Sequence, residues 1–390
     1  MSTIRWTETD TPRSARWHSE NGTPPPRRVL VVDEGLNAAT AHRLACEGTA
    51  LLWRGDFPRA RRLLAALGRR VDRKPARWGE DDPAASFPLH RRARGHRARV
   101  LGKLLVPVDA DAGGHRLDVP RAPDVRRACA EAYGPPSGPV VVALTELLGV
   151  LGAHQWRTKG VPVPALGARI HPHYGVFSPV RGEYVDLVAR APLPVSAGRG
   201  TAYDLGTGTG VLAAVLARRG FDRVVATDIS PRALACARDN ARRLHLADRI
   251  DVLGPGLFPD GRADLVVCNP PWVPARPTSA LERGVYDPGG GMLHEFLARL
   301  AAHLVPGGEG WLVLSDLAEH LGLRTRADLL ARVAAAGLRV VDRIDTRPRH
   351  SRARDTADPL HPARAAEVTS LWRLAVDPGG APGPVHRSGR

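Results

Sequence analysis

The feature that most constrains the fold of this chain is a regular alternation of short apolar and amphipathic segments that begins near Gly200. Apolar runs such as TAYDLG, DRVVATD, IDVLG and DLVVCN predict strands, and the segments 211–219 and 231–244 have the spacing of helices. The alternation continues with helices expected at 293–304 and 327–336 and strands at GWLVLSD, RVVDRID and TSLWRLAV. We therefore expect a doubly wound, mostly parallel α/β sheet, which binds ligands beyond the carboxyl ends of its strands.

The length and the local composition divide the chain into four regions. A chain of 390 residues is long enough for two domains. Residues 1–27 are polar and end in TPPPRR, so we expect a flexible tail there. Residues 28–160 predict a smaller N-terminal α/β domain, and residues 161–376 hold the alternating region. Residues 377–390 are rich in glycine and proline and are expected to be disordered.

Within the smaller domain, individual segments predict both strands and helices. RVLVVD and RVLGKLLVPVD (99–109) predict strands, and apolar residues recur at helical spacing in PRARRLLAALGRRV. APDVRRACAEAY and VVVALTELLGVLGAH predict two further helices. The polar, arginine-rich stretch 76–97 predicts an exposed loop or the start of a helix.

The net charge of +16 comes almost wholly from arginine, which supplies 53 of the 56 basic residues. Glycine, proline and alanine are also abundant, and this combination is typical of GC-rich coding. Residues 1–170 hold 28 basic and 17 acidic residues, and the rest of the chain holds 28 and 23. We favour a solvated basic surface as the interpretation, with contact to nucleic-acid phosphates as the alternative.

Cysteine spacing and hydropathy bound the class of protein. The four cysteines are far apart in sequence, which argues against a disulfide framework and fits a reducing cytoplasm. No stretch approaches the ~18 apolar residues of a membrane span, so no membrane partner is expected. His171 and His173 have no further ligand residues beside them, and we predict no metal site.

A glycine-rich turn follows the first strand of the alternating region and opens directly into a helix. Such glycines let a ligand approach the backbone closely, and the start of the helix offers free N–H groups. The acid before the glycines could face a ligand amine. The predicted cofactor-binding residues of this turn are Asp204, Gly206, Thr207, Gly208 and Gly210.

The second strand ends at Asp228 and Ile229, 22 and 23 residues after Gly206. An acid at this place is the expected partner of ribose hydroxyls, and both residues are predicted to bind the cofactor. On spacing alone NAD is a competing ligand. The dinucleotide fingerprint, however, has a third glycine where this chain has Val211.

The fourth strand stops at Asn269-Pro270-Pro271-Trp272. Prolines cannot extend a strand as ordinary ladder members, because they have no N–H to donate. They would instead hold the Asn269 amide and the Trp272 ring rigidly at the end of the strand. Such an arrangement suits a site that holds a flat, polar group against an aromatic face.

In these motifs the chain resembles the class I S-adenosylmethionine (SAM)-dependent methyltransferases whose fourth strand ends in [N/D]-P-P-[Y/F/W]. The resemblance covers about residues 170–345 and is strongest to the release-factor glutamine methyltransferases and related small-domain methyltransferases. Five stretches carry it: YGVFSPVRGEYVDLV, DLGTGTG, ATDISPRALACARDNARR, DLVVCNPPWVP and LERGVYDPGGGMLHEFL. It implies a Rossmann-like seven-stranded class I methyltransferase sheet and S-adenosyl-L-methionine as the cofactor.

The resemblance also implies roles for the NPPW residues, because this motif marks enzymes that methylate a nitrogen conjugated to a π system. The Asn269 side chain and the Pro270 carbonyl would accept hydrogen bonds from that nitrogen. Pro271 would keep the turn rigid, and Trp272 would stack on the acceptor plane. Positioning and electrostatics can supply most of the catalytic effect, so no strong base is required. Asn269 also belongs to the predicted cofactor-binding set.

Two stretches depart from the family pattern. The first is the leader motif, in which Phe177 and Pro179 match the family. The family has an acidic stretch after them, whereas this chain has a single acid, Glu183. Phe177, Pro179 and Glu183 are predicted to contact substrate. After the third strand the chain has Gly254-Pro255-Gly256-Leu257-Phe258 where the family often carries an acid near the adenine ring. Adenine contacts are then expected from the backbone and from Phe258.

The sequence therefore predicts a SAM-dependent N-methyltransferase that modifies a planar amide or amino nitrogen, with a protein glutamine side chain as the favoured acceptor. The first alternative is an exocyclic amino group of adenine or guanine in RNA or DNA. A small N-terminal α/β domain also precedes this motif in ribosomal-RNA guanine methyltransferases. The second alternative is a catalytically silent SAM-fold binding module, against which the intact Asp204, Asp228 and Asn269 argue.

Overall fold

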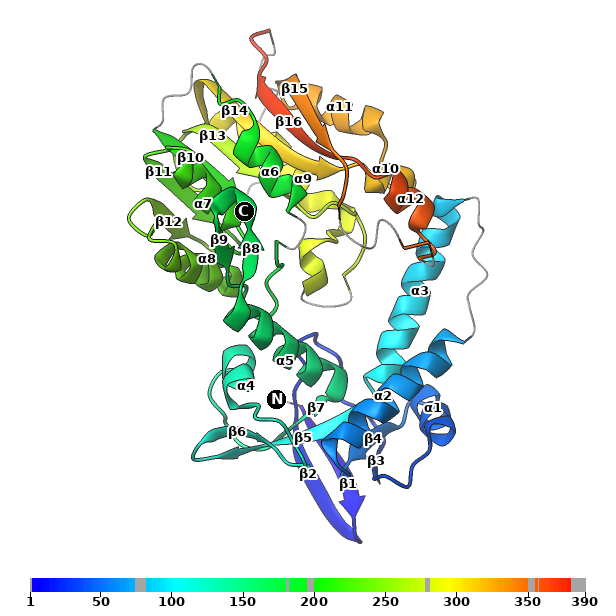
Figure 1. Cartoon of the computed structure of the whole chain (residues 1–390). Coiled ribbons are helices and arrows are strands. Elements are labelled where there is room, and N and C mark those ends of the chain that lie inside the picture. Colours follow the sequence, from blue (N-terminus) through cyan, green and yellow to red (C-terminus); the bar gives the residue numbers. More distant parts are fainter. Residues whose placement is uncertain are drawn as a thin grey trace, which may run out of the picture. The chain divides into compact units, whose positions relative to one another are not determined.

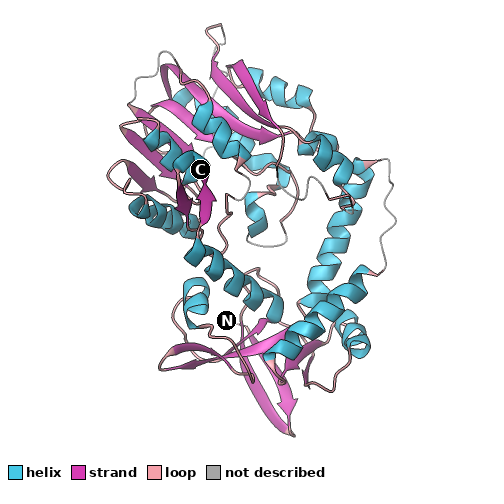
Figure 2. Cartoon of the chain, in the orientation of Figure 1, coloured by secondary structure: helices cyan, strands magenta, loops and turns pink. Residues whose placement is uncertain are grey.

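The computed structural model describes residues 2–73, 82–179, 182–194, 200–277, 281–349, 355–356 and 358–379. The chain divides into two compact units, which we describe separately (Figure 1). Unit 1 comprises residues 1–79 and 88–158, and unit 2 comprises residues 80–87 and 159–390. Both units combine strands and helices (Figure 2).

Unit 1 is built on a seven-stranded mixed sheet with the order β1-β2-β7-β5-β4-β3, and β6 pairs with β5. Its strands are β1 Thr3–Glu8, β2 Thr11–Trp17, β3 Val29–Val32, β4 Ala50–Trp53, β5 Leu104–Asp111, β6 Gly114–Leu117 and β7 Val140–Ala143. Its helices are α1 Ala38–Cys46, α2 Phe57–Asp72, α3 Pro83–Leu101, α4 Arg126–Tyr133 and α5 Leu144–Lys159. The smaller α/β fold expected for this part of the chain is therefore present.

The first two strands correct the expectation of a flexible tail over residues 1–27. β1 and β2 pair antiparallel through a tight turn in which Thr9 and Asp10 have positive φ angles of 47° and 57°. Ile4 is only 2% exposed and joins the core of the sheet. It is the one fully buried side chain of this hairpin. With a single buried position, the two strands have no alternation of apolar and polar residues that would predict them.

Three further boundaries in unit 1 differ from the prediction. The segment VVVALTELLGVLGAH begins as strand β7, because consecutive buried β-branched valines favour a strand, and α5 starts only at Leu144. The stretch 76–97 overlaps α3, which continues to Leu101. The strand expected over 99–109 therefore begins only at Leu104.

Unit 2 contains a second seven-stranded sheet, with the order β12-β11-β10-β13-β14-β16-β15. The neighbouring pairs from β12 to β14 are parallel, and β16 runs antiparallel to both β14 and β15. The strands are β10 Thr201–Leu205, β11 Arg223–Thr227, β12 Ile250–Leu253, β13 Ala263–Cys268, β14 Leu304–Ser315, β15 Leu338–Thr346 and β16 Thr369–Val376. Each of these strands was predicted from its apolar run, and the Rossmann-like class I sheet is confirmed.

Helices cover both faces of this second sheet. Side chains of α6 Glu183–Arg190, α7 Val211–Arg218 and α8 Pro231–Arg243 share one buried cluster with the sheet residues Ala202 and Leu265. Side chains of α9 Gly291–Leu300 and α11 Arg326–Ala335 share another cluster with Tyr203 and Val266. Neighbouring strand residues point to opposite faces, so two cores form from single apolar runs.

The remaining elements of unit 2 are short. They are β8 Val161–Val163 and β9 Ala168–Ile170, which form a two-stranded sheet, α10 Leu317–His320, α12 His361–Ala366, and four 3-10 turns at Pro164–Leu166, Leu281–Gly284, Pro288–Gly290 and Ala301–His303. Among the described residues, no helix is both long and apolar enough to span a membrane. Most of the expected disordered tail, residues 380–390, lies outside the described residues.

Candidate active site

Three neighbouring strands of unit 2 end side by side, and a predicted site motif follows each of them. Leu205, the last residue of β10, is the register partner of Thr227 in β11 and of Cys268 in β13. Parallel strands bring their carboxyl ends to one edge of a sheet. The glycine turn, Asp228 and Asn269 therefore emerge together at this edge, as the sequence predicted.

The three glycines of the turn have different surroundings. Gly206, Gly208 and Gly210 have positive φ angles of 69°, 56° and 81°, which residues other than glycine rarely adopt. A Cβ atom on Gly206 would collide with Met292, and one on Gly210 would lie 3.2 Å from the Cα atom of Ala237. A Cβ atom on Gly208 would meet nothing closer than 4.0 Å. Gly208 is thus the position with open space for a ligand.

Asp204 braces the glycine turn from below. Its Oδ2 atom accepts hydrogen bonds from Thr207 Oγ1 at 2.6 Å and from the Ala213 backbone N–H at 2.9 Å. The residue is 1% exposed, and burial raises the pKa of its carboxyl group to about 6, with a smaller contribution from Asp228. These bonds give Asp204 and Thr207 a role in shaping the turn. Direct contact between Asp204 and a ligand amine stays a prediction.

Asp228 stands beside Gly208 at the end of β11. Its Oδ2 accepts from the Gly208 N–H at 3.0 Å and its Oδ1 from the Ser230 N–H at 2.8 Å. Burial raises the pKa of this carboxyl group, although these backbone hydrogen bonds oppose the effect. Each oxygen retains acceptor capacity for hydroxyl groups of a ligand.

Two exposed apolar side chains accompany this carboxylate. Ile229 is 75% exposed, and Leu253, at the end of the adjacent strand β12, is 45% exposed. An open glycine backbone, a carboxylate with spare acceptors and exposed apolar side chains are the features required for a nucleoside. The residues present therefore fit the adenosine part of SAM.

Phe258, which is expected to contact adenine, has several side chains packed around its ring. Its ring stacks on His303 at 4.4 Å between centroids and faces Phe296 at 6.4 Å, while the Arg299 guanidinium lies 4.9 Å from its centroid. Phe258 thus packs against the cluster of α9. Contact of Phe258 with the adenine base stays a prediction.

The NPPW motif has an internal hydrogen bond that the sequence analysis missed. Trp272 Nε1 donates to Asn269 Oδ1 at 2.9 Å. This bond fixes the asparagine side chain, and a carbonyl oxygen has a second lone pair for another donor. Pro270 is buried, and the partly buried Trp272 ring packs against three separate apolar clusters. Tryptophan at this position lacks the hydroxyl of tyrosine but supplies an N–H donor.

Segments that are distant in sequence converge around this motif. Val273, directly after Trp272, forms a bridge with Tyr286, and its carbonyl accepts from the Asp287 N–H at 3.1 Å. Asp287 Oδ2 in turn accepts from the Met292 N–H at 2.8 Å. Met292 lies against Gly206, as described above. The 3-10 turn Pro288–Gly290 therefore leads directly into α9.

The leader segment reaches the same region. The Phe177 ring lies against Gly284, where an added Cβ atom would approach the Phe177 Cβ to 2.7 Å. Pro179 is buried, whereas Val180 and Arg181 lie outside the described residues. Glu183, 4% exposed, begins α6, and its carboxylate and that of Asp204 both raise the pKa of the buried Tyr184 beyond the effect of burial. Contact of these leader residues with substrate stays a prediction.

A buried asparagine joins His171, which precedes the leader motif, to the glycine turn. Asn240 in α8 is 1% exposed; its Oδ1 accepts from the His171 N–H at 2.8 Å, and its Nδ2 donates to the carbonyls of His171 at 3.2 Å and Thr209 at 3.0 Å. The sequence analysis missed this residue. Its only sequence signal is a polar side chain on the apolar face of a helix.

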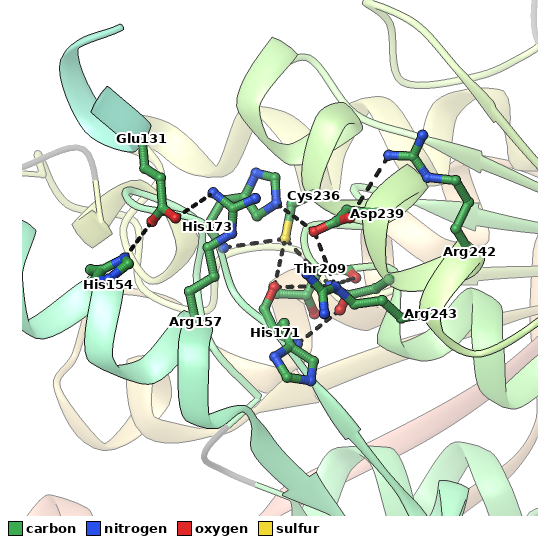
Figure 3. Close-up of polar contacts among 11 residues, drawn as sticks. Glu131, His154, Arg157, His171, His173, Thr209, Cys236, Asp239, Arg242 and Arg243 are labelled. Carbon is green, nitrogen blue, oxygen red and sulfur yellow. Dashed lines mark hydrogen bonds and ion pairs between the residues drawn. The ribbon is translucent and has the colours of Figure 1, made fainter. Parts of the chain in front are cut away.

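His171 and His173, which directly precede the leader motif, both contact α8. His173 Nε2 lies 3.2 Å from Asp239 Oδ2, and the His173 N–H donates to Cys236 Sγ at 3.4 Å (Figure 3). The described parts of the chain contain no group of three or more His, Cys, Asp or Glu side chains arranged to hold a metal ion. These contacts give the histidines a role in positioning the leader.

Comparison with known proteins identifies the domain that carries this edge. The family model of the methyltransferase small domain matches residues 167–331. This match confirms the predicted relationship and supports SAM as the cofactor. Residues 167–331 of unit 2 are therefore similar to the methyltransferase small domain, and the sheet of unit 2 has the class I methyltransferase fold.

Individual relatives match parts of the same region. The chain is 37% identical over 169 residues to a release factor glutamine methyltransferase of Cereibacter sphaeroides, covering 40% of this chain and 59% of the relative. It is 40% identical over 91 residues to a ribosomal protein L11 methyltransferase of Vibrio vulnificus, covering 23% of this chain and 31% of the relative. The chain thus spans between about a third and three fifths of the length of these relatives.

Solved structures that are similar to this chain include a ribosomal protein L11 methylase of Lactobacillus delbrueckii. Its sequence identity is 20% and its TM-score is 0.33, and the match covers 50% of this chain and 78% of that one. The similar structures also include a geranyl diphosphate methyltransferase in complex with SAM, with 16% identity and a TM-score of 0.37 over 54% of this chain and 88% of that one.

Proposed function

We propose that this protein is a SAM-dependent N-methyltransferase that methylates a planar amide nitrogen, with a glutamine side chain of a protein as the acceptor. The observation that carries the proposal is the Asn269–Trp272 hydrogen bond at the end of β13, beside the glycine turn of β10. A rigid carbonyl acceptor and a partly exposed aromatic ring suit a flat group with N–H donors.

The residues at the carboxyl ends of β10, β11 and β13 would have the following roles. SAM supplies an electrophilic methyl group when bound. Gly208, Asp228 and Ile229 would hold its adenosine part, as the open backbone and the carboxylate suggest. The second lone pair of Asn269 Oδ1 and the Pro270 carbonyl would accept the two N–H groups of the acceptor amide. Accepting these hydrogen bonds raises electron density on a nitrogen whose lone pair is otherwise delocalised.

Orientation supplies the rest of the catalytic effect. The Trp272 ring would hold the amide plane, and its N–H keeps Asn269 in one rotamer. Positioned acceptors of this kind act without reorganisation, so a strong base is unnecessary. Phe177, Pro179 and Glu183 would form the substrate side, because the leader packs against the segment that follows NPPW.

The glutamine acceptor is favoured because the chain is 37% identical over 169 residues to a release factor glutamine methyltransferase. The alternative acceptor is an exocyclic amino group of adenine or guanine in RNA or DNA, which has the same planar N–H geometry. A catalytically silent SAM-binding module is the other alternative. Asp228 and Asn269 are intact, which disfavours it.

The test is a transfer assay with radiolabelled-methyl SAM and a lysate from a strain that lacks the gene. Labelled samples are divided and treated with protease or with ribonuclease and deoxyribonuclease. Label that is sensitive to protease and absent with Asn269→Ala supports amide methylation of a protein. Asn37→Ala, the same change at a helix cap in unit 1, is the matched control and should retain transfer.

Other outcomes select the alternatives. Label that is sensitive to nuclease would show that the acceptor is an amino group of a nucleic acid and not a protein side chain. Absence of label, together with measurable SAM binding by calorimetry, would support the silent module and contradict the proposal.

A further inference from the structure

The helices α2 and α3 of unit 1 hold most of the excess positive charge of the chain. Residues 57–73 and 83–101 together contain 11 arginines and one acidic residue, Asp72. The remainder of the chain contains 45 basic and 39 acidic residues. Coding bias would enrich arginine everywhere, so it does not explain a concentration on two helices that lack acidic residues.

The arginines of α2 form a stripe. Arg62, Arg69 and Arg73 follow at spacings of seven and four residues and so share one side of the helix. Arg59 and Arg70 flank them at spacings of three residues from Arg62 and Arg73. The opposite side of the helix is buried in the core of unit 1 through Phe57, Ala60, Leu63 and Leu67. The stripe therefore faces away from the core.

The second helix extends this basic surface. Arg92, Arg94 and Arg99 of α3 are exposed and lie in the part of α3 that belongs to unit 1. Arg97 Nε lies 3.0 Å from Asp72 Oδ1, and its guanidinium covers Gly68 of α2. The only acid of the two helices is thus used to join them. We call Arg59, Arg62, Arg69, Arg70, Arg73, Arg92, Arg94 and Arg99 the arginine face.

Within the described part of the chain, most of the arginine face has no internal counter-charge. Among the described residues, no acidic side chain pairs with Arg62, Arg69 or Arg73 of α2, nor with Arg92 or Arg94 of α3. Guanidinium groups hold phosphate oxygens in a bidentate manner and remain charged at all physiological pH values. Because the apolar side of α2 is buried, the helix has no apolar face to insert into a bilayer.

We propose that the arginine face docks the phosphate backbone of RNA. The charge and its exposure carry the phosphate assignment. The choice of RNA rests on the proposed function, because the relatives of unit 2 include enzymes named for a ribosomal protein. The arginine face would contact phosphate groups and no base edges, so it would bind RNA without sequence specificity.

The experiment measures binding of a fluorescein-labelled RNA duplex of about 20 base pairs by anisotropy, at KCl concentrations between about 50 and 200 mM. SAM is omitted, so the result does not depend on methyl transfer. The variant is Arg62→Gln/Arg69→Gln/Arg73→Gln, since glutamine has nearly the helix propensity of arginine. The control is Arg218→Gln/Arg262→Gln/Arg339→Gln, which removes the same charge from exposed positions of unit 2.

We expect the wild type and the control to bind with similar Kd values and steep salt dependence. The α2 variant should bind at least about tenfold more weakly near 100 mM KCl, and its log–log salt slope should be shallower by about two to three. Unchanged thermal unfolding of the variant separates this loss from misfolding.

Three results would overturn the proposal. One is an equal loss in the α2 variant and the control, which would indicate non-specific charge. Another is tighter binding to a DNA duplex of the same sequence than to RNA. The last is sedimentation with anionic phospholipid vesicles without binding to RNA.

Discussion

The candidate functional residues of the two units lie in different kinds of place. In unit 2 they lie at one edge, where the parallel strands β10, β11 and β13 end together and each is followed by a short motif. In unit 1 they lie on the outer side of two helices, where arginines recur without any motif. Strand-end motifs can be found in the sequence, whereas a helix surface becomes visible only when the buried side of each helix is known.

The largest effect should come from Asn269. Replacing it with alanine removes the acceptor for the substrate amide and releases Trp272, so kcat should fall by about a hundredfold to a thousandfold. SAM affinity, measured by calorimetry, should change by less than about threefold, because its adenosine contacts lie at β10 and β11. Trp272→Phe keeps the ring and removes only the N–H, and should fall between the wild type and Asn269→Ala. An equal loss of SAM binding would assign Asn269 to the cofactor instead.

The next effect concerns the cofactor end of the same edge. Asp228→Asn replaces a carboxylate whose hydrogen bonds to hydroxyl groups are charge-assisted, so the Kd for SAM should rise by about tenfold to a hundredfold. Asp251→Asn, on the exposed side of β12 and paired with Arg223, is the matched control and should leave the Kd unchanged. If both variants weaken SAM binding alike, net charge rather than a specific contact is responsible.

A third change tests whether buried polar contacts hold the edge together. Asn240→Ala removes the amide that joins His171 to Thr209 and leaves buried backbone groups without it, which should lower the free energy of unfolding by about 2 to 4 kcal/mol. Asp239→Ala, one residue earlier, removes partly exposed ion pairs and should cost less than about 1 kcal/mol. Urea unfolding followed by circular dichroism compares them. Equal costs would contradict the role given to Asn240.

The last effect is a pH dependence that originates at Asp204. Its folded pKa of about 6 lies above the ordinary value of 3.8, so the ionised form is disfavoured in the fold. The stabilisation associated with its protonated form is complete below pH ~4 and is lost as the pH rises through ~6. The wild type should therefore lose about 2 to 3 kcal/mol relative to Asp204→Asn across this window. A constant difference in unfolding free energy from pH 4 to 7 would contradict the raised pKa.

The strand-end motifs explain how much of the site could be read from the sequence. Asp228 and Asn269 were found because each follows an apolar run of a single strand. The Asn269–Trp272 bond and the contact of Met292 with Gly206 depend on rotamers and on tertiary packing, so no local pattern predicts them. The stacking of Phe258 on His303 also depends on tertiary packing, and its expected contact with adenine stays a prediction.

The same reasoning applies to the fold. The long apolar runs of unit 2 predicted all seven strands of its sheet. In unit 1 the hairpin of β1 and β2 buries only Ile4 and was mistaken for a tail. The net charge was first attributed to coding bias, because its concentration on the arginine face requires the positions of α2 and α3.

The most direct test of the central claim determines the chemical form of the transferred methyl group. Protein labelled with radioactive methyl groups is isolated from the transfer reaction and hydrolysed in acid. An N-methyl amide of glutamine releases its label as methylamine, which is volatile once the hydrolysate is made alkaline, whereas a methylated amine side chain keeps its label in a non-volatile amino acid. We predict that the label is volatile and that none is transferred by Asn269→Ala. Label retained in a non-volatile amino acid would contradict amide methylation by this site.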